Sequence, residues 1–283
     1  MNRLSRALQS PKYLKKKRRR TAITVILFVL CLIAIIIAIV YVLRSPFLQI
    51  SSINIKGVTT LNSEEIKGKV LEVLSGDYFS IIPRTSVLFY PKKSIKNILF
   101  ESYKQIEKID INRKDVSNLE INIMEYKPIA LVCEGFYEDN VDDSNCFLVN
   151  KDGYVFAKSV SSSVSLFHYY IETDKGDDII GLNFIDSNRF KELQKFIENI
   201  SNSGIPILGM LINENGAYEL YAKNKDNSEA IIYFDDRSSL RKTSSNLIAF
   251  WNDSQIIKKG ATTALMFDYI NLRFGNNIFY VTK

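Results

Sequence analysis

The sequence predicts an α+β protein with one membrane-spanning helix near its N-terminus and two folded domains beyond it. An uncharged apolar run covers residues 21–43, a stretch of alternating strand and helix patterns follows it, and the remainder of the chain is rich in short strand patterns. A length of 283 residues fits about two domains of roughly 100–200 residues each. The hydrophobic content of 46% and the charged content of 24% are typical of a globular protein.

Residues 1–20 carry the basic character of the chain. They contain nine Lys or Arg and no acid, and removing these nine charges from the net charge of +6 leaves −3 for everything after Arg20. The body of the chain therefore has no excess of basic residues that a nucleic-acid phosphate backbone would neutralise. We therefore expect residues 1–20 to be a basic cytoplasmic tail beside the membrane, and we expect no nucleic-acid partner.

Residues 21–43 are uncharged over their whole length, which is 23 residues. At 1.5 Å per residue a helix of this length spans about 34 Å, enough to cross a hydrocarbon core of roughly 30 Å. A cleaved signal peptide has a shorter apolar region, about 7–15 residues, and a small-residue cleavage site, which residues 41–44 lack. The sequence predicts an uncleaved transmembrane helix, and the basic residues on its N-terminal side predict a cytoplasmic N-terminus. The chain from about Arg44 onward is then expected outside the cytoplasmic membrane.

The three cysteines leave one question open. Cys31 lies in the membrane segment, where it serves as a small apolar residue. Cys133 and Cys146 bracket a short acidic stretch in a region where a disulfide persists. Two positions in a sequence carry no geometry, so a bridge and two separate thiols both remain open.

Residues 48–126 have the predicted order strand, helix, helix, strand, strand. The alternation in "ISSINIKG" indicates the first strand, and "KQIEKIDINR" and "NLEINIMEY" indicate the last two. Asn62 is expected to cap the first helix, with Glu65 completing a capping-box-like arrangement. Pro91 is expected to begin the second helix. Because an isolated hairpin is marginally stable, both helices are expected to cover the sheet.

The two ends of this region resemble a known family. "INIKGVTTLNSEEI" and "LEINIMEYKPIALV" are similar to the opening and the close of the POTRA domain in the bacterial cell-division proteins FtsQ and DivIB. Glu125, Pro128 and Ala130 match the closing motif, while Tyr126 stands where arginine is common. The resemblance implies that residues 48–126 form a POTRA-like β-α-α-β-β domain.

Residues 127–283 predict a mixed β-rich domain with two covering helices. Strands are expected in "IALVC" and on both sides of a turn in "CFLVNKDGYVFA". Asp186 is expected to cap one helix, and a second helix is expected through Leu240, Leu247 and Trp251. Between the helices, "PILGMLIN", "GAYELYAK" and "EAIIYFD" read as three short strands.

The chain closes with a strand pattern that turns at residues 275–277 and then runs apolar to the last lysine. This segment lacks the usual protection of a sheet edge. Between Tyr269 and Val281 the only charge is Arg273, and there is no proline. This segment is similar to the terminal strand of the FtsQ/DivIB family. The positions that match that strand are Tyr269, Leu272, Arg273 and Phe274.

The sequence offers no candidate for catalysis. Its one histidine, His168, lies among aromatic residues, and neither a Gly-x-Ser-x-Gly, a His-Glu-x-x-His nor a P-loop motif is present. Two cysteines without a supporting histidine do not make a zinc site. We expect no enzymatic activity, cofactor, metal or small-molecule substrate.

The resemblance implies a bitopic scaffold of the division septum that recruits FtsB/DivIC-like and FtsL-like partners. We expect a partner to add a strand at the C-terminal edge, with main-chain bonds giving affinity and alternate side chains giving specificity. Arg273 is expected to pair with a partner carboxylate. The residues expected to contact the partner are Tyr269, Leu272, Arg273, Phe274, Ile278 and Tyr280. Two alternatives remain: the terminal strand belongs to the core, or the chain is a membrane-anchored POTRA-type transport or assembly factor.

Overall fold

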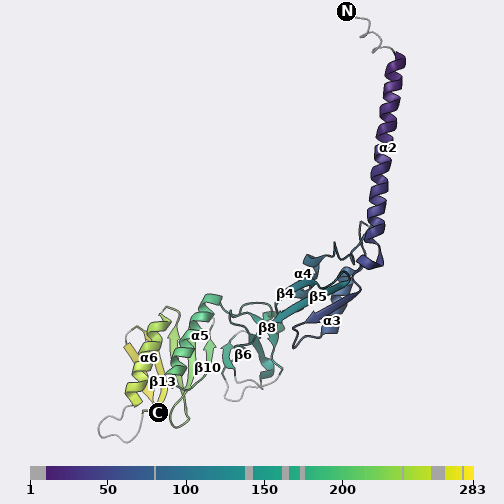
Figure 1. The fold of residues 1–283 in the computed structure, drawn as a ribbon. Helices are drawn as coiled ribbons and strands as arrows, with labels where there is room; N and C mark the ends of the chain where they lie inside the picture. Colours follow the sequence, from purple (N-terminus) through teal and green to yellow (C-terminus); the bar gives the residue numbers. More distant parts are fainter. Residues whose placement is uncertain are drawn as a thin grey trace, which may run out of the picture. The chain divides into compact units, whose positions relative to one another are not determined.

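Figure 1 shows the chain as a long N-terminal helix followed by two units built on β-sheets. This computed structural model describes residues 11–79, 81–137, 143–160, 166–172, 176–213, 215–237, 239–255, 265–275 and 277–283. The chain divides into the units Met1–Glu125 and Tyr126–Lys283. The predicted α+β class, with one N-terminal apolar helix and a large β-sheet, is confirmed.

The first helix, α2 (Pro11–Leu43), has the length and composition of a membrane span. Within its candidate span, Lys15–Leu43, an 18-residue stretch has a mean hydropathy of 3.5, and no residue of that stretch is buried inside the protein. Phe28, for example, is 66% exposed. An apolar helix that is exposed along most of its length is stable when lipid covers its side chains, because all of its backbone hydrogen bonds are internal.

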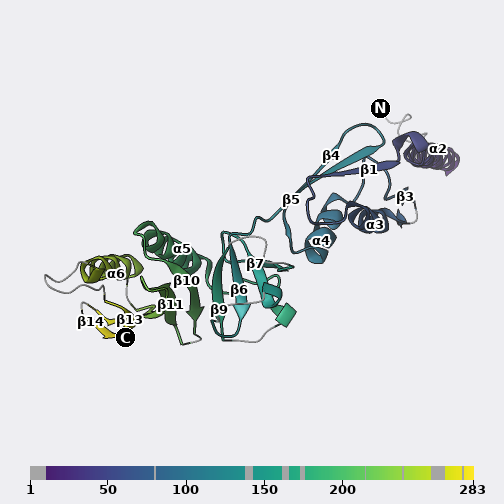
Figure 2. The same cartoon turned by 90° about the horizontal axis from the view of Figure 1, so that it is seen from below.

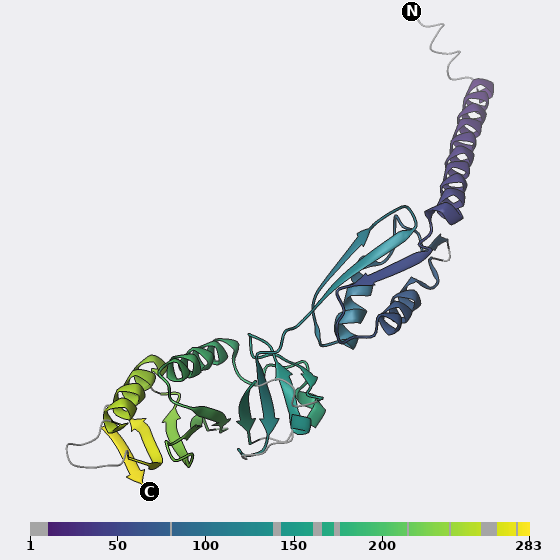
Figure 3. The same ribbon diagram turned by 60° about the horizontal axis from the view of Figure 1, so that its bottom comes forward.

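The rest of the first unit is a three-stranded sheet with two helices on one side (Figure 3). The sheet order is β1-β5-β4, with β1 parallel to β5 and β5 antiparallel to β4. Its elements are η1 (Pro46–Leu48), β1 (Ser52–Lys56), α3 (Ser63–Leu74), β2 (Asp77–Tyr78), β3 (Ile82–Pro83), α4 (Lys92–Ser102), β4 (Ile106–Arg113) and β5 (Asn118–Glu125). Ile66, Val70, Ile95 and Leu99 of the helices pack on Ile109 and Ile121 of the sheet.

The start of α3 follows the predicted cap but not the predicted capping box. The Asn62 side chain accepts a hydrogen bond from the Glu64 backbone N–H at 3.0 Å. Glu65 does not turn back to the cap, because its carboxylate accepts a hydrogen bond from the Tyr103 hydroxyl at 3.1 Å. Tyr103 lies at the end of α4, so this bond joins the two helices instead of closing one of them. The expected capping box at Glu65 is therefore wrong.

The second unit holds a nine-stranded sheet in the order β14-β13-β12-β11-β10-β9-β6-β7-β8. Its strands are β6 (Ala130–Glu134), β7 (Cys146–Val149), β8 (Val155–Lys158), β9 (Phe167–Ile171), β10 (Ile207–Ile212), β11 (Ala217–Lys223), β12 (Glu229–Asp235), β13 (Phe267–Phe274) and β14 (Asn277–Thr282). Its helical elements are η2 (Asp143–Asn145), η3 (Gly176–Ile179), α5 (Ser187–Asn202) and α6 (Leu240–Gln255). Figure 2 shows α5 and α6 on the same side of β10, β11, β13 and β14.

The main core of the second unit lies between these helices and the sheet. Phe190, Leu193 and Phe196 of α5 and Leu247 of α6 are buried there. Asp186 caps α5 as predicted, since its Oδ1 accepts hydrogen bonds from the backbone N–H groups of Asn188 and Arg189 at 3.0 Å each. A second, smaller cluster of buried side chains comes from strands of the same sheet. Its members are Leu131, Cys133, Cys146, Tyr170, Leu211 and Tyr221.

The terminal segment forms two strands, one on each side of the turn that the sequence predicted, although both were expected to act as one edge strand. Gly275, with φ +70°, makes the turn between β13 and β14, a conformation that favours glycine. β13 pairs in parallel with β12 on one side and antiparallel with β14 on the other. The edge of the sheet is therefore β14, and β13 is an inner strand.

Candidate docking site

The C-terminal hairpin, defined here as β13 and β14, forms one border of the nine-stranded sheet (Figure 3). Among the described residues no strand pairs with the outer side of β14. The sequence of β14, "NIFYVT", contains neither a charge nor a proline. This edge therefore lacks the features that usually prevent a sheet from pairing with another chain.

The two faces of β13 have different surroundings. Ile270 and Leu272, which are 0% and 5% exposed, point into the core beneath the helices. Because side chains alternate along a strand, Tyr269, Asn271 and Arg273 lie on the opposite face. Leu272 thus supplies packing for the hairpin, and its side chain is covered by the protein's own core.

Arg273 is held in place by neighbours on that opposite face. Its guanidinium carbon lies 5.3 Å from the ring centroid of Tyr233 on β12. Its Nε and its backbone N–H both donate to Oδ1 of Asn271, at 3.1 and 3.2 Å. Among the described residues Arg273 has no carboxylate within ion-pair distance. Its charge is therefore positioned and still available to an acidic group from outside.

Tyr233 links this arginine to the rest of the sheet face. Its ring makes an edge contact with Tyr269, with the centroids 6.0 Å apart. Burial raises the pKa of Tyr233, the charge of Glu219 raises it further, and the charge of Arg273 lowers it. Tyr233 is therefore a neutral phenol next to Arg273 at neutral pH.

Large apolar side chains remain exposed on the hairpin. Phe274 is 56%, Phe279 53%, Tyr280 47% and Val281 42% exposed. The rings of Phe274 and Phe279 meet edge to face, with centroids 5.1 Å apart. Tyr280 leans on Phe250 of α6 at 5.1 Å, so its ring is anchored while half of it stays accessible.

The six residues that the sequence indicated therefore fall on two sides of the sheet. Tyr269 and Arg273 share the open face, while Ile278 packs against the core on the helix side, where Tyr280 also makes its ring contacts. Phe279 and Val281 were not predicted, although alternation along β14 places them opposite Tyr280. Tyr233 was also missed, and no local pattern points to it, because it reaches Arg273 only through the pairing of β12 with β13.

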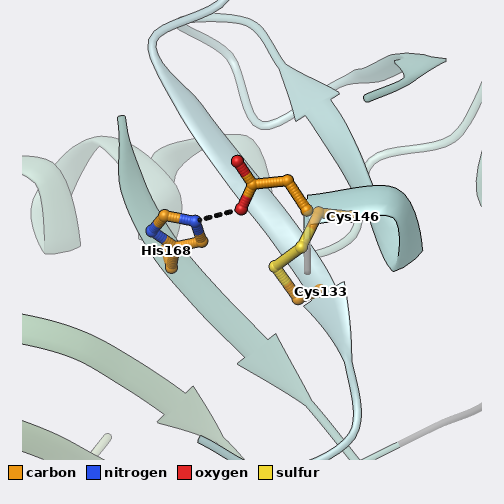
Figure 4. Close-up of a disulfide and its surroundings, with 4 residues drawn as sticks. Cys133, Cys146 and His168 are labelled. Carbon is orange, nitrogen blue, oxygen red and sulfur yellow. Dashed lines mark hydrogen bonds and ion pairs between the residues drawn. A yellow bond between two sulfur atoms is a disulfide. The ribbon is translucent and has the colours of Figure 1, made fainter. Parts of the chain in front are cut away.

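A disulfide joins Cys133 on β6 to Cys146 on β7, several strands away from the C-terminal hairpin in the sheet order (Figure 4). The two cysteines are direct partners in the antiparallel ladder, so the bond joins positions that the sheet already brings together. His168 lies beside it, with Nε2 3.0 Å from Oδ1 of Asp143. The disulfide leaves neither sulfur as a thiolate for catalysis. Within the described part of the chain no group of three or more His, Cys, Asp or Glu side chains is arranged to hold a metal ion.

The fold and the site fit a single-pass membrane protein whose largest sheet, among the described residues, ends in an unprotected strand edge. The chain is similar to two curated proteins named Cell division protein DivIB, from the Hall and Loch Maree strains of Clostridium botulinum. Each match is 32% identical over 147 residues, which is 51% of this chain and 48% of the relative. The chain thus spans about half the length of the curated relatives it matches. No protein-family model matches the chain. The two relatives support its membership of the FtsQ/DivIB family, in agreement with the resemblance of its sequence motifs.

Proposed function

We propose that this chain is a bitopic scaffold of the bacterial division machinery, and that its C-terminal hairpin accepts a strand from a partner polypeptide. The observation that carries the proposal is the edge strand β14, which is uncharged, contains no proline and has no neighbour on its outer side among the described residues. The names of the DivIB relatives support a role in cell division.

The backbone of β14 indicates which groups a partner strand would use. The N–H of Lys283 donates to the Met266 carbonyl at 3.0 Å, which is on the β13 side. Because N–H groups alternate in direction along a strand, those of Val281 and Phe279 also face β13 and that of Tyr280 faces outward. A partner strand would therefore pair with the main chain at Tyr280 and at every second residue from it.

The side chains that flank this edge fit a partner with apolar and acidic residues. Phe279 and Val281 lie on one face of β14, and the exposed half of Tyr280 lies on the other. A partner strand that alternates apolar residues would cover both faces at once. An acidic residue near its end would meet Arg273, whose guanidinium is oriented by Asn271 and Tyr233.

The family resemblance suggests the rest of the assignment. We propose that the first outer unit is a POTRA-like domain, that the N-terminus is cytoplasmic, and that the partners are FtsB/DivIC-like and FtsL-like division proteins at the septum. The basic residues before α2 support this orientation by the positive-inside rule.

A co-purification experiment tests docking at the hairpin. The full chain is expressed with its DivIC-like and FtsL-like partners as the parent sequence, Phe274→Asp, Arg273→Glu, or Phe136→Asp. Phe136 is 68% exposed and follows β6, several strands away from the hairpin in the sheet order, so it serves as a matched control. We expect both hairpin variants to recover at most about a tenth of the partner that the parent chain and the control recover. Full recovery by both hairpin variants contradicts docking at this site.

Localisation tests the division role separately. A fluorescent-protein fusion of the parent chain is expected to form bands at midcell. A uniform rim around dividing cells contradicts the division role, and it favours the alternative of a membrane-anchored transport or assembly factor.

A further inference from the structure

The first unit exposes large apolar side chains close to the end of its membrane helix. We define the membrane-proximal apolar surface as Phe47, Phe79, Ile81, Leu88 and Phe89, which are 72%, 93%, 49%, 53% and 53% exposed. Isolated apolar residues on a protein surface are common, whereas a group of them marks contact with a membrane or a protein. Three of these five residues are phenylalanines.

The hairpin of β2 and β3 is fastened to the last turn of α2. Arg44 follows α2 directly, and its Nη2 lies 3.1 Å from Oδ2 of Asp77 on β2. Its Nε donates to the backbone carbonyl of Ile81 at 3.1 Å. Leu43, the last residue of α2, is 6% exposed. Phe79 and Ile81 are therefore held beside the point where α2 ends.

Leu88 and Phe89 are held near the same point by a second set of backbone bonds. The N–H of Ile50 donates to the Thr85 carbonyl at 2.8 Å, and the N–H of Val87 donates to the Leu48 carbonyl at 2.9 Å. The chain that leaves α2 is thus paired with the segment that leads directly into Leu88. Phe47 lies on the first of these two paired segments, in η1.

Phe79 adopts an unusual backbone conformation. Its φ of +51° lies in the left-handed region, which non-glycine residues with bulky side chains rarely adopt. The side chain that this turn presents is 93% exposed, so no packing inside the protein accounts for it. Residues held in such conformations are concentrated at sites of binding and function.

Basic residues lie near these apolar side chains. The guanidinium of Arg84 lies over the ring of Tyr78, with its carbon 5.5 Å from the centroid. Arg44, which is bonded to Asp77 and to the Ile81 carbonyl, is a second cation in this region. Protein surfaces that lie in the headgroup region of a bilayer typically combine basic residues with apolar side chains.

We propose that the membrane-proximal apolar surface inserts into the outer leaflet of the membrane that α2 spans. The bonds of Arg44 tie the β2–β3 turn to the end of a helix whose apolar length matches the hydrocarbon core, so Phe79 and Ile81 lie at the level of the bilayer interface. The occupant of this surface is therefore lipid. The first unit is then attached to the membrane both through α2 and through its own aromatic side chains, independently of any division partner.

Depth-dependent fluorescence quenching tests this insertion in the full chain. The chain has one tryptophan, Trp251, which Trp251→Phe removes. Into this background Phe79→Trp, Phe89→Trp or Met124→Trp is introduced, and each protein is reconstituted in phosphatidylcholine vesicles with or without bromine on the acyl chains. Met124 is the matched control because it is 54% exposed and belongs to the same unit. It lies six residues along β5 from Asn118, which pairs with Ser52 at the membrane end of β1, so it is about 20 Å away from that end.

We expect brominated lipid to remove at least half of the emission of Phe79→Trp and Phe89→Trp and to leave that of Met124→Trp unchanged. Circular dichroism against the parent chain verifies the fold of each variant. Phe79→Trp and Phe89→Trp are read independently, so one poorly folded variant leaves the other as a test. The proposal is overturned if brominated lipid quenches the tryptophans at residues 79 and 89 no more than the tryptophan at residue 124. The surface would then be a binding site for a protein partner.

Discussion

The side chain of Asn224 binds both main-chain groups of Phe267. The Phe267 N–H donates to Asn224 Oδ1 at 3.0 Å, and Asn224 Nδ2 donates to the Phe267 carbonyl at 2.9 Å. Asn224 is 4% exposed and Phe267 is fully buried. An amide from the turn after β11 thus takes the place of a neighbouring strand at the first residue of β13, and it fixes where the C-terminal hairpin begins.

Replacing this amide is expected to loosen the hairpin. Asn224→Ala leaves a buried N–H and a buried carbonyl of Phe267 without partners, at a cost of about 1–3 kcal/mol. Hydrogen exchange of the full chain in detergent measures the result as faster exchange of amides in β13 and β14, with little change in β4 and β5. Asn199→Ala, on the exposed side of α5, is the control. Unchanged exchange in the hairpin of Asn224→Ala contradicts the anchoring role.

Proline at Tyr280 is expected to block strand addition while leaving most of the hairpin intact. Tyr280→Pro removes an N–H that faces away from β13, and the proline ring also hinders an approaching strand. Tyr280→Ala is the matched control, because it removes the ring and keeps the N–H. We expect Tyr280→Pro to weaken partner binding at least about tenfold more than Tyr280→Ala, which corresponds to about 1.4 kcal/mol. Equal affinities of the two variants in a titration with the partner's extracytoplasmic segment would show that the main chain at residue 280 is not used.

The Cys133–Cys146 disulfide is expected to stabilise the second unit. It closes a loop with a sequence separation of 13, for which chain entropy predicts a contribution of about 3 kcal/mol. The double variant Cys133→Ala/Cys146→Ala should therefore melt several degrees lower, and dithiothreitol should lower the Tm of the parent chain toward that of the variant. Cys31→Ser, at the free cysteine in α2, should keep the parent Tm and the parent response to reductant. A parent Tm that is insensitive to reductant under conditions where both thiols become alkylated contradicts this prediction.

Glu125 is expected to make the first unit sensitive to acid. Burial alone would raise the pKa of its carboxyl group, but hydrogen bonds from the hydroxyl and backbone N–H groups of Thr60 and Thr59 outweigh burial and lower the pKa to about 2. A carboxylate with a lowered pKa in the folded state contributes stability above its ordinary pKa of 4.5, and this contribution is lost as the pH falls toward 2.

Glu125→Gln tests this dependence. At pH 7 we expect the variant to be less stable than the parent by about 1–2 kcal/mol, because a neutral amide accepts these hydrogen bonds less strongly than a carboxylate. The difference in unfolding free energy should shrink between pH 4.5 and pH 2. Thermal unfolding of both chains across this range measures it, and a difference that does not depend on pH contradicts the assignment.

Local patterns predicted much of this fold. Asn62 and Asp186 cap α3 and α5 where the sequence placed them. These features depend on residues within one or two turns of each other, so a short window of sequence contains them. The β2–β3 hairpin escaped prediction because its strands have two residues each, too few to show an alternation.

The site was harder to predict because it depends on pairings across the chain. Leu272 and Arg273 were both expected to contact the partner. Alternation along β13 places them on opposite faces, and the structure puts Leu272 in the core. The contact between Arg273 and Tyr233 depends on the parallel register of β12 and β13, which no local pattern encodes. The division of the terminal segment at Gly275 likewise moved the edge from β13 to β14.

The pairing of β12 with β13 extends over only three residue pairs, from Ile231 with Tyr269 to Tyr233 with Asn271. The hairpin is therefore joined to the rest of the sheet by a short ladder. A strand that binds β14 from outside restrains the outer side of the hairpin. Part of its binding energy then stabilises the β12–β13 ladder on the inner side. Occupancy of the edge would then be visible as slower amide exchange in β12, a strand that the partner never touches.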